Sequence, residues 1–308
     1  MEENNKDKDF RRQMVIVGVV NIVAGLFSLG LFMLHKYEIL KNGNNFILSY
    51  TVILPLLIGF ITGYILKKEG RDILFLSLYN TLAALLINGA VLQEGFICLL
   101  IISPLILGMI LLGCLIGYYI ANRGSNNLKI SFGILIFSIV LVDFILPNNE
   151  ELSVQDEVII NAPPEKVWEY IIEYPKNEEK SDYWLFQIGL PHPIQSRAAE
   201  HKVGAKRECV FAGDLVFEEK ITKIVPNKEL VFEVTKQPEH PEIMGHLDLK
   251  YGQFILEELP GGKTKLVGIS GYYLYVRPTL YFDLWATSII RNVHLKVMNN
   301  IKNLSEKG

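Results

Sequence analysis

A charged pair and a thiol stand at alternate positions on either side of Gly213. If the chain reverses there as a β-hairpin, three pairs of residues oppose each other on one face of a sheet, because side chains two positions apart point to the same side. The pairs are Arg207 with Glu219, Cys209 with Phe217, and Phe211 with Leu215. The face is otherwise apolar, so this register predicts an ion pair among hydrophobic side chains.

Two interpretations of Arg207 and Glu219 are open. In one, Arg207 orients a ligand, because a guanidinium can hold a carboxylate or phosphate through two parallel hydrogen bonds. In the other, the two residues form a structural ion pair. We favour this second interpretation, because structural ion pairs perturb pKa values as active sites do, so a charged pair among apolar residues is not by itself a sign of function. Cys209 is expected to be a buried filler, because a reactive thiolate needs a neighbouring base and the sequence places none beside it.

Further candidate pocket residues are a histidine and three aromatic side chains. His294 lies one residue from the apolar stripe of a predicted helix and could project into a cavity as an acid or base. A satisfied, partly buried histidine is the favoured interpretation. Trp184, Tyr272 and Trp285 could line the same pocket or form ordinary core. No histidine group has the spacing of a zinc site and no nucleotide-binding motif is present, so neither a metal nor a cofactor is expected.

The elements that must position these residues begin after residue 150. From Val154 the apolar residues alternate, which predicts a strand ending at Ile160, and the prolines that follow favour a short helix over 165–173. Five more strands are predicted over 205–211, 215–224, 229–235, 251–258 and 264–275. After Pro278 an apolar stripe at helical spacing predicts a long C-terminal helix. Its members are Phe282, Ala286, Ile289, Val293, Val297, Ile301 and Leu304.

This order of elements resembles the SRPBCC superfamily, whose START-like or helix-grip fold is shared by lipid-transfer domains and polyketide cyclases. The segment from Val158 to Trp168 looks like the family's opening signature, the segment from Gly213 to Phe232 like its central hairpin, and 261–266 like the turn into its last strand. The resemblance covers about residues 153–306 and looks closest to uncharacterised polyketide cyclase/dehydrase-like members with membrane segments. It implies a curved antiparallel sheet around the long helix, with a cavity for a hydrophobic ligand.

The first half of the chain is dominated by apolar segments. A bilayer core needs about 20 apolar helical residues. Five candidate spans are 14–34, 46–66, 73–92, 96–120 and 130–146. Lysine and arginine gather before the first span, after the second and after the fourth, so the positive-inside rule places the N-terminus in the cytoplasm. With five spans the C-terminal half lies outside the cell, and the loss of one span would reverse that side.

Polar groups and small residues inside these spans favour packing over transport. Asn21 and Asn80 are expected to hydrogen-bond neighbouring helices, because a transport path would usually need paired charges. The motifs at 59–63 and 113–117 have glycines four positions apart, which lets helices approach closely. They can act within one bundle or between two copies, so a homo-oligomer through the transmembrane helices stays an open interpretation.

Composition sets the class of protein. A chain of 308 residues with 50% hydrophobic content is expected to form two domains, a transmembrane domain over 1–150 and a helix-grip domain over 151–308. The predicted fold class is therefore α+β, with an all-α five-helix bundle before the curved sheet. The net charge of -3 shows no basic field, so nucleic acid is excluded as a partner.

Three functions are consistent with these features. The favoured one is a multi-pass cell-membrane protein whose C-terminal domain binds a hydrophobic or amphiphilic small molecule near the outer surface. One alternative is a cyclase- or hydrolase-like enzyme that uses the same cavity, with His294 or Glu219 as general base. The other is a sensor in which ligand occupancy changes helix packing in the membrane.

Overall fold

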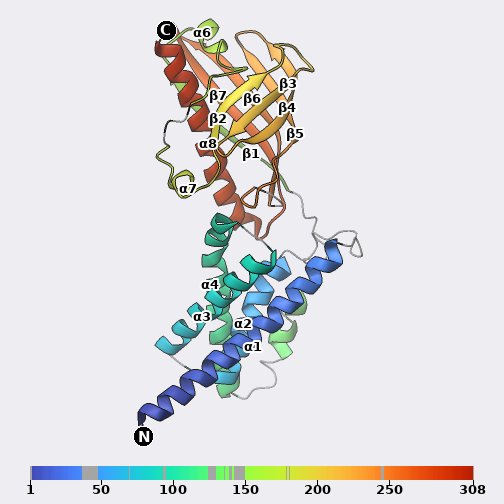
Figure 1. Cartoon of the computed structure of the whole chain (residues 1–308), viewed down its shortest axis with the longest axis vertical. Helices are drawn as coiled ribbons and strands as arrows, with labels where there is room; N and C mark the ends of the chain where they lie inside the picture. Colours follow the sequence, from blue (N-terminus) through green and yellow to red (C-terminus); the bar gives the residue numbers. More distant parts are fainter. Residues whose placement is uncertain are drawn as a thin grey trace. The chain divides into compact units, whose positions relative to one another are not determined.

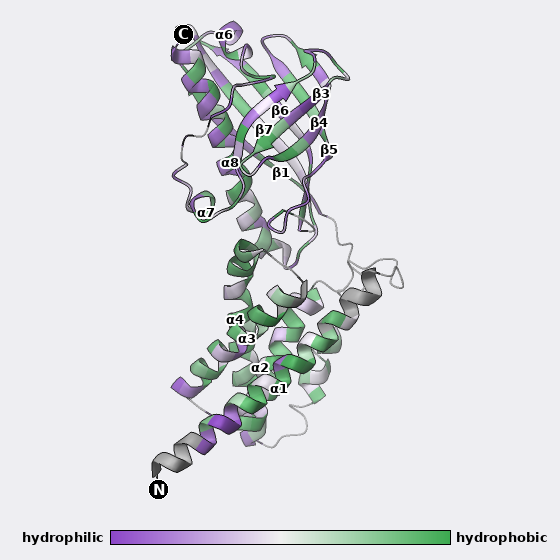
Figure 2. Ribbon diagram, in the orientation of Figure 1, coloured by the Kyte–Doolittle hydropathy of each residue, from purple (hydrophilic) through white to green (hydrophobic). Residues whose placement is uncertain are grey.

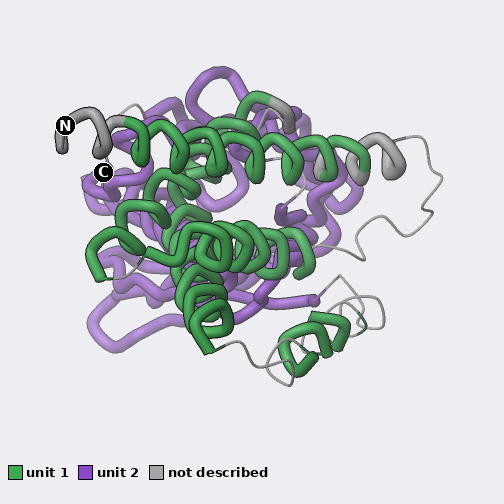
Figure 3. Tube along the Cα trace, turned by 90° about the horizontal axis from the view of Figure 1, so that it is seen from below, with its two compact units in different colours: residues 1–148 green, residues 149–308 purple. Residues whose placement is uncertain are grey.

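The computed structural model describes residues 2–36, 48–68, 70–92, 95–123, 130–134, 136–138, 141, 150–177, 179, 181–243 and 246–307. The chain divides into two compact units, Met1–Asn148 and Asn149–Gly308, whose elements are labelled in Figure 1 and which are coloured separately in Figure 3.

The first unit is helical. Its elements are α1 (Glu2–Lys36), the π-helical segment η2 (Ser49–Ile53), α2 (Leu54–Leu66), α3 (Arg71–Leu92) and α4 (Phe96–Arg123). Hydrophobic residues dominate α2 and α4 (Figure 2). Among the described residues, three helical segments are long and apolar enough to cross a membrane, namely Lys8–Phe27, Ser49–Leu66 and Phe96–Arg123.

The prediction of five membrane spans is therefore corrected to three such helices in the described part of the chain. Helix α3 occupies the place of the third predicted span but is not among them. It begins with Arg71 and Asp72 and carries the buried polar residues Ser77, Asn80 and Thr81. The fifth predicted span, 130–146, lies largely outside the described residues.

Helices α2 and α4 approach each other through their glycines. A Cβ atom added to Gly59 would lie 2.0 Å from the carbonyl oxygen of Ile110, and one added to Gly63 would lie 2.2 Å from the carbonyl oxygen of Cys114. Gly113 and Gly117 are equally close to the backbone of α2, at 2.1 and 2.2 Å. Both glycine motifs are therefore used for helix packing within the chain.

A buried polar contact joins three helices of this unit. Asn21 of α1 donates a hydrogen bond from Nδ2 to Oδ1 of Asn80 on α3, at 2.8 Å. Thr62 of α2 reaches the same oxygen at 3.5 Å. The expectation that Asn21 and Asn80 bond to neighbouring helices is confirmed.

The second unit is a curled sheet with a long helix. Its strands are β1 (Glu150–Ile160), β2 (Pro193–Ala198), β3 (Lys206–Phe211), β4 (Leu215–Val225), β5 (Glu229–Lys236), β6 (Leu247–Leu259) and β7 (Lys263–Leu274). They form one antiparallel half-barrel in the order β1-β7-β6-β5-β4-β3-β2. Its helices are α6 (Pro164–Trp168), α7 (Trp184–Gln187) and α8 (Thr279–Lys307). Figure 1 shows α8 beside the curled sheet.

Helix α6, helix α7 and strand β2 differ from the sequence prediction, which does not include α7. Helix α6 ends at Trp168 instead of continuing to 173, because Ile171 and Ile172 turn into the core. Strand β2 is not predicted by the sequence. Its inward positions include Ser196, which is 2% exposed, so polar and apolar residues do not alternate there.

The two ends of the sheet differ in how well they are filled. At the linker end, where the chain arrives from the first unit, Glu150 pairs with Leu274. At the distal end, Ile160 pairs with Thr264. A cluster of buried residues fills the distal part between the sheet and α8; it includes Ile160, Val167, Leu266, Met298 and Ile301.

Candidate functional site

A cavity of about 70 Å³ lies between α8 and strands β3 to β7. Most of its lining is apolar, with aromatic rings from the sheet and two valines from α8; these residues are Phe211, Phe217, Phe232, Phe254, Val293 and Val297. One water needs roughly 10–15 Å³ measured in this way, so the cavity holds about five. Pockets for drug-sized ligands are usually about 300–1,000 Å³. The space therefore suits a compact guest or one end of a longer one.

The small size has a structural cause in the aromatic rings. The Phe211 and Phe217 rings lie 4.6 Å apart between centroids. The Phe232 ring occupies the place of the missing side chain at Gly252, where an added Cβ would lie 2.3 Å from the ring. The concave face of the sheet is thus largely filled by its own rings.

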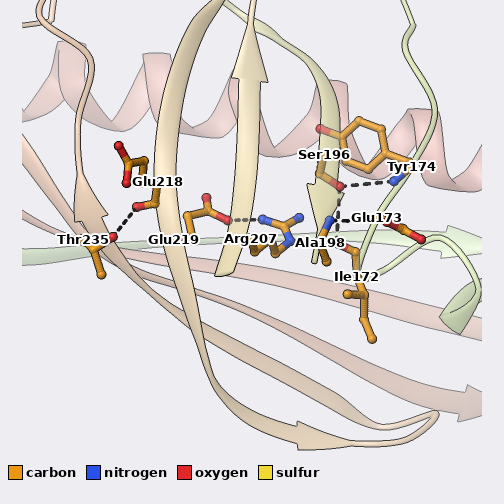
Figure 4. Close-up of polar contacts among 9 residues, drawn as sticks. All are labelled: Ile172, Glu173, Tyr174, Ser196, Ala198, Arg207, Glu218, Glu219 and Thr235. Atoms are coloured by element: carbon orange, nitrogen blue, oxygen red, sulfur yellow. Dashed lines mark hydrogen bonds and ion pairs between the residues drawn. The ribbon is translucent and has the colours of Figure 1, made fainter. Parts of the chain in front are cut away.

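Arg207 and Glu219 have the register that the turn at Gly213 predicts. They oppose each other on β3 and β4, and Cys209 and Phe211 oppose Phe217 and Leu215 as expected. Nη1 of Arg207 donates a hydrogen bond to Oε2 of Glu219, and the two side chains are 2% and 6% exposed (Figure 4).

Further contacts hold the Arg207 guanidinium in place. The Arg207 Nε donates a hydrogen bond to the backbone oxygen of Ile172 at 2.8 Å, and the guanidinium carbon Cζ lies 4.5 Å from the centroid of the Phe232 ring. Burial opposes the charge on Arg207, but the adjacent Glu219 carboxylate outweighs it and the pKa of Arg207 is raised. Burial raises the pKa of Glu219, and Arg207 opposes that rise. The positive charge is already neutralised inside the protein.

Cys209 and Tyr174 complete this wall of the cavity. Burial, followed by the nearby Glu219 carboxylate, raises the pKa of the Cys209 thiol to about 12, so the thiol stays protonated. The buried Tyr174 hydroxyl adjoins that thiol, and the two side chains interact with each other. Tyr174 thus brings a polar group to the lining of the cavity.

A second polar group comes from β1, β7 and α8. Nδ1 of His294 lies 2.9 Å from Oδ2 of Asp156, and Nε2 lies 2.8 Å from Oγ of Ser270. Burial lowers the pKa of His294, so the ring is neutral at pH 7, and Asp156 opposes that change. A carboxylate only accepts, so the ring proton is on Nδ1 and Nε2 accepts the hydrogen bond from Ser270.

The sequence singled out His294 but not its two partners. Asp156 stands in the inward alternation of Val154, Val158 and Ile160, and its side chain is 7% exposed. A carboxylate at an inward-facing position of a strand indicates that a buried polar partner lies nearby. Ser270 occupies the corresponding inward row of β7 and lines the cavity together with His294.

The three aromatic candidates do not line the cavity. Tyr272 is fully buried and donates from its hydroxyl to Oδ1 of Asp283 at 2.6 Å, and burial raises the pKa of that hydroxyl. Trp184 is 44% exposed, and its ring lies edge-on to Trp285 at 6.4 Å. Within the described part of the chain, no group of three or more histidine, cysteine and acidic residues could hold a metal ion.

The topology defines the second unit as a helix-grip-like domain, an antiparallel half-barrel with a long C-terminal helix. Comparison with family profiles and with curated proteins finds no match. Among solved structures, the chain is similar to a protein from Nitrosospira multiformis, at 12% identity over 49% of this chain and 94% of that one, with a TM-score of 0.34. It is also similar to a protein of unknown function from Staphylococcus aureus, at 15% identity over 52% of this chain and 96% of that one, with a TM-score of 0.35. Norcoclaurine synthase from Thalictrum flavum, solved with dopamine and hydroxybenzaldehyde, matches at 10% identity over 52% and 89%, with a TM-score of 0.36.

Proposed function

We propose that this protein is a membrane-anchored member of the SRPBCC superfamily that binds a compact, uncharged and mostly apolar molecule between α8 and the sheet. The supporting observation is a cavity whose mostly apolar lining includes three residues with hydroxyl groups, Tyr174, Tyr251 and Ser270. A few convergent polar groups in an apolar pocket are typical of small-molecule sites. The apolar helices of the first unit would hold the domain at the membrane. The side of the membrane on which the domain lies stays a prediction.

The charges around the cavity favour a neutral guest. Arg207 is paired with Glu219, and His294 is neutral. Asp156 is shared between His294 and Arg291, whose Nε lies 3.4 Å from Oδ1. An anionic guest would have to displace Glu219 from Arg207, and disrupting a buried pair costs several kcal/mol. In place of Arg207 as a clamp for acidic ligands, the proposal has neutral hydroxyl groups bond to the guest, with Ser270 as an acceptor because its proton is donated to His294.

A second function is favoured by the Asp156, His294 and Ser270 contacts. This is the arrangement of a serine nucleophile, its general base and the carboxylate that orients the base. In acyl transfer, Ser270 Oγ would bond to an ester carbonyl carbon, its proton would pass through His294 Nε2 to the leaving alcohol, and water would then release the acid. The backbone at Ser270 is paired with both β1 and β6, so it offers no free N–H for the developing oxyanion. Binding is therefore the first proposal.

A matched pair of ligands tests the binding proposal. The full chain, purified in detergent, would be titrated with a fatty alcohol and with the fatty acid of equal chain length, and binding followed by native mass spectrometry. The alcohol should bind more tightly, and Ser270→Ala or Tyr174→Phe should weaken it, while Ser153→Ala, which alters an exposed serine of β1 outside the cavity lining, should not. Tighter binding of the acid would contradict the proposal. Release of acetate from p-nitrophenyl acetate that Ser270→Ala abolishes would favour the enzyme.

A further inference from the structure

Exposed apolar side chains of the second unit gather around the beginning of α8. Six large hydrophobic residues of this unit are exposed in its described part, namely Ile159, Trp184, Ile188, Val203, Leu280 and Leu284. Leu280 is 81% exposed and Leu284 is 67% exposed. Isolated exposed hydrophobic residues are ordinary, whereas grouped ones mark a contact surface.

We group four of these residues as the apolar rim, namely Trp184, Ile188, Leu280 and Leu284, together with the half-buried Trp285, because they lie on α7, at its end and on the first turns of α8. Leu280 and Leu284 are one helical turn apart on α8 and share a side of the helix. Trp285 follows Leu284 and contacts Trp184 of α7 at 6.4 Å between ring centroids. A hydrogen bond of 3.1 Å between the hydroxyls of Tyr183 and Ser288 also ties α7 to α8. These two contacts hold α7 beside α8.

The register places the apolar rim at the linker end. Glu150, the first residue of β1, pairs with Leu274, and α8 begins five positions later at Thr279. The chain therefore arrives from its apolar first unit at the end of the domain that carries the rim. Val203 and Ile159, the two exposed residues outside the rim, belong to the distal half of the domain.

The hollow part of the domain lies toward the same end. The buried cluster of the core occupies the distal part of the sheet. The cavity lining includes Val234 and Leu249, which are partly exposed. Leu249 pairs with Tyr272, two positions from the end of β7. These two partly exposed lining residues therefore lie toward the linker end.

We propose that the apolar rim docks on the surface of a lipid bilayer, with Leu280 and Leu284 among the acyl chains and Trp184 and Trp285 at the level of the headgroups. Tryptophan is enriched at that level because its ring is apolar and its N–H is polar. Docking presents the linker end of the cavity to the lipid, so an apolar guest enters without crossing water. This inference rests on the membrane anchoring in the proposed function.

Quenching of tryptophan emission by brominated phosphatidylcholine tests the docking. The tryptophans Trp168, Trp184 and Trp285 all lie in the second unit, and Trp168 packs against the distal core cluster. The full chain would be reconstituted into phosphatidylcholine vesicles with and without the brominated lipid. Trp168→Phe, which keeps both rim tryptophans, should lose emission in brominated vesicles. The double variant Trp184→Phe and Trp285→Phe, which keeps only Trp168, should not.

A second pair of variants separates docking from anchoring. Leu280→Gln with Leu284→Gln should reduce the quenching of Trp184 and Trp285, whereas Ile159→Gln with Val203→Gln, at the distal end, should leave it unchanged. Each variant would also be washed with alkaline carbonate. If the chain stays in the membrane after the wash but its tryptophan emission is not quenched, the docking is overturned and the anchoring stands. If a crosslinked dimer is also found in that case, the rim pairs two copies of the chain instead of docking on lipid. A chain that the wash removes contradicts the anchoring itself.

Discussion

Replacing Glu219 by glutamine tests whether Arg207 belongs to a structural pair. The substitution keeps the size of the side chain but leaves the Arg207 guanidinium, which is 2% exposed, without its counter-charge. Removing one partner of a buried ion pair costs about 3–5 kcal/mol, because the remaining charge is uncompensated. We expect the free energy of unfolding of the second unit to fall by about this amount.

The double replacement Arg207→Met and Glu219→Leu removes both charges and should behave differently. Apolar residues of similar volume in place of a buried pair are often neutral or stabilising by about 1–4 kcal/mol. The hydrogen bond from Arg207 Nε to Ile172 is also lost, which costs about 1 kcal/mol. The double variant should therefore recover most of the stability that Glu219→Gln loses.

Urea unfolding followed by tryptophan emission measures both effects. The three tryptophans lie in the second unit, so the signal reports that unit within the full chain. A double-mutant cycle with the single variants isolates the coupling between the two side chains. If Glu219→Gln unfolds at the same urea concentration as the original protein, the reasoning about an uncompensated buried charge is refuted.

Three further perturbations address other parts of the molecule. Burial lowers the pKa of His294 from 6.5 in the folded protein, so the unfolded chain binds the proton more readily. The free energy of unfolding should therefore be constant above about pH 6.5 and fall as the pH drops toward the folded-state pKa. His294→Gln should flatten this part of the plot of urea midpoint against pH. Gly252→Ala would place a Cβ 2.3 Å from the Phe232 ring, so it should lower the free energy of unfolding in urea by about 1–3 kcal/mol. Adding Phe232→Leu should restore part of that stability. An unchanged urea midpoint would contradict the close packing. Gly113→Ala would place a Cβ 2.1 Å from a carbonyl oxygen of α2 and should lower the melting temperature of the detergent-solubilised chain, whereas Gly108→Ala, with nothing within 4 Å, should leave it unchanged.

Local patterns in the sequence predict the part of the site that one hairpin makes. Gly213 has φ +82°, a backbone conformation that side chains disfavour, so a glycine fixes the turn and the turn fixes the register of Arg207 and Glu219. Strand β2 escapes prediction because Ser196 points inward and breaks the alternation. Its buried backbone is satisfied by Tyr174, whose N–H bonds to the Ser196 carbonyl oxygen, a contact between distant segments.

The other half of the site depends on long-range pairing. His294 and Asp156 are 138 positions apart, and only the pairing of β1 with β7 brings Asp156 near Ser270. The apolar stripe of α8 was predicted to pass through Ile289 and beside His294, but Ile290 and His294 are the buried residues at that level. His294 is held inward there by its contacts with Asp156 and Ser270, and Val293 of the predicted stripe lines the cavity beside it. The volume of the cavity depends on how aromatic rings pack, which periodicity does not describe.

Polar contacts between α8 and the sheet explain how the linker half of the domain can be hollow and still ordered. Glu306 accepts from the Asn161 backbone N–H at 2.7 Å near the distal end, His294 bonds to Asp156 at the middle, and Asp283 accepts from Tyr272 at 2.6 Å toward the linker end. Apolar packing against the core cluster also secures the distal part of the helix. Toward the linker end the hydrogen bonds to Asp156 and Tyr272 supply the positioning that a filled core would otherwise give. Loss of the Asp283 contact, as in Tyr272→Phe, should therefore loosen the first turns of α8 and raise hydrogen exchange there, while exchange around Ile301 stays slow.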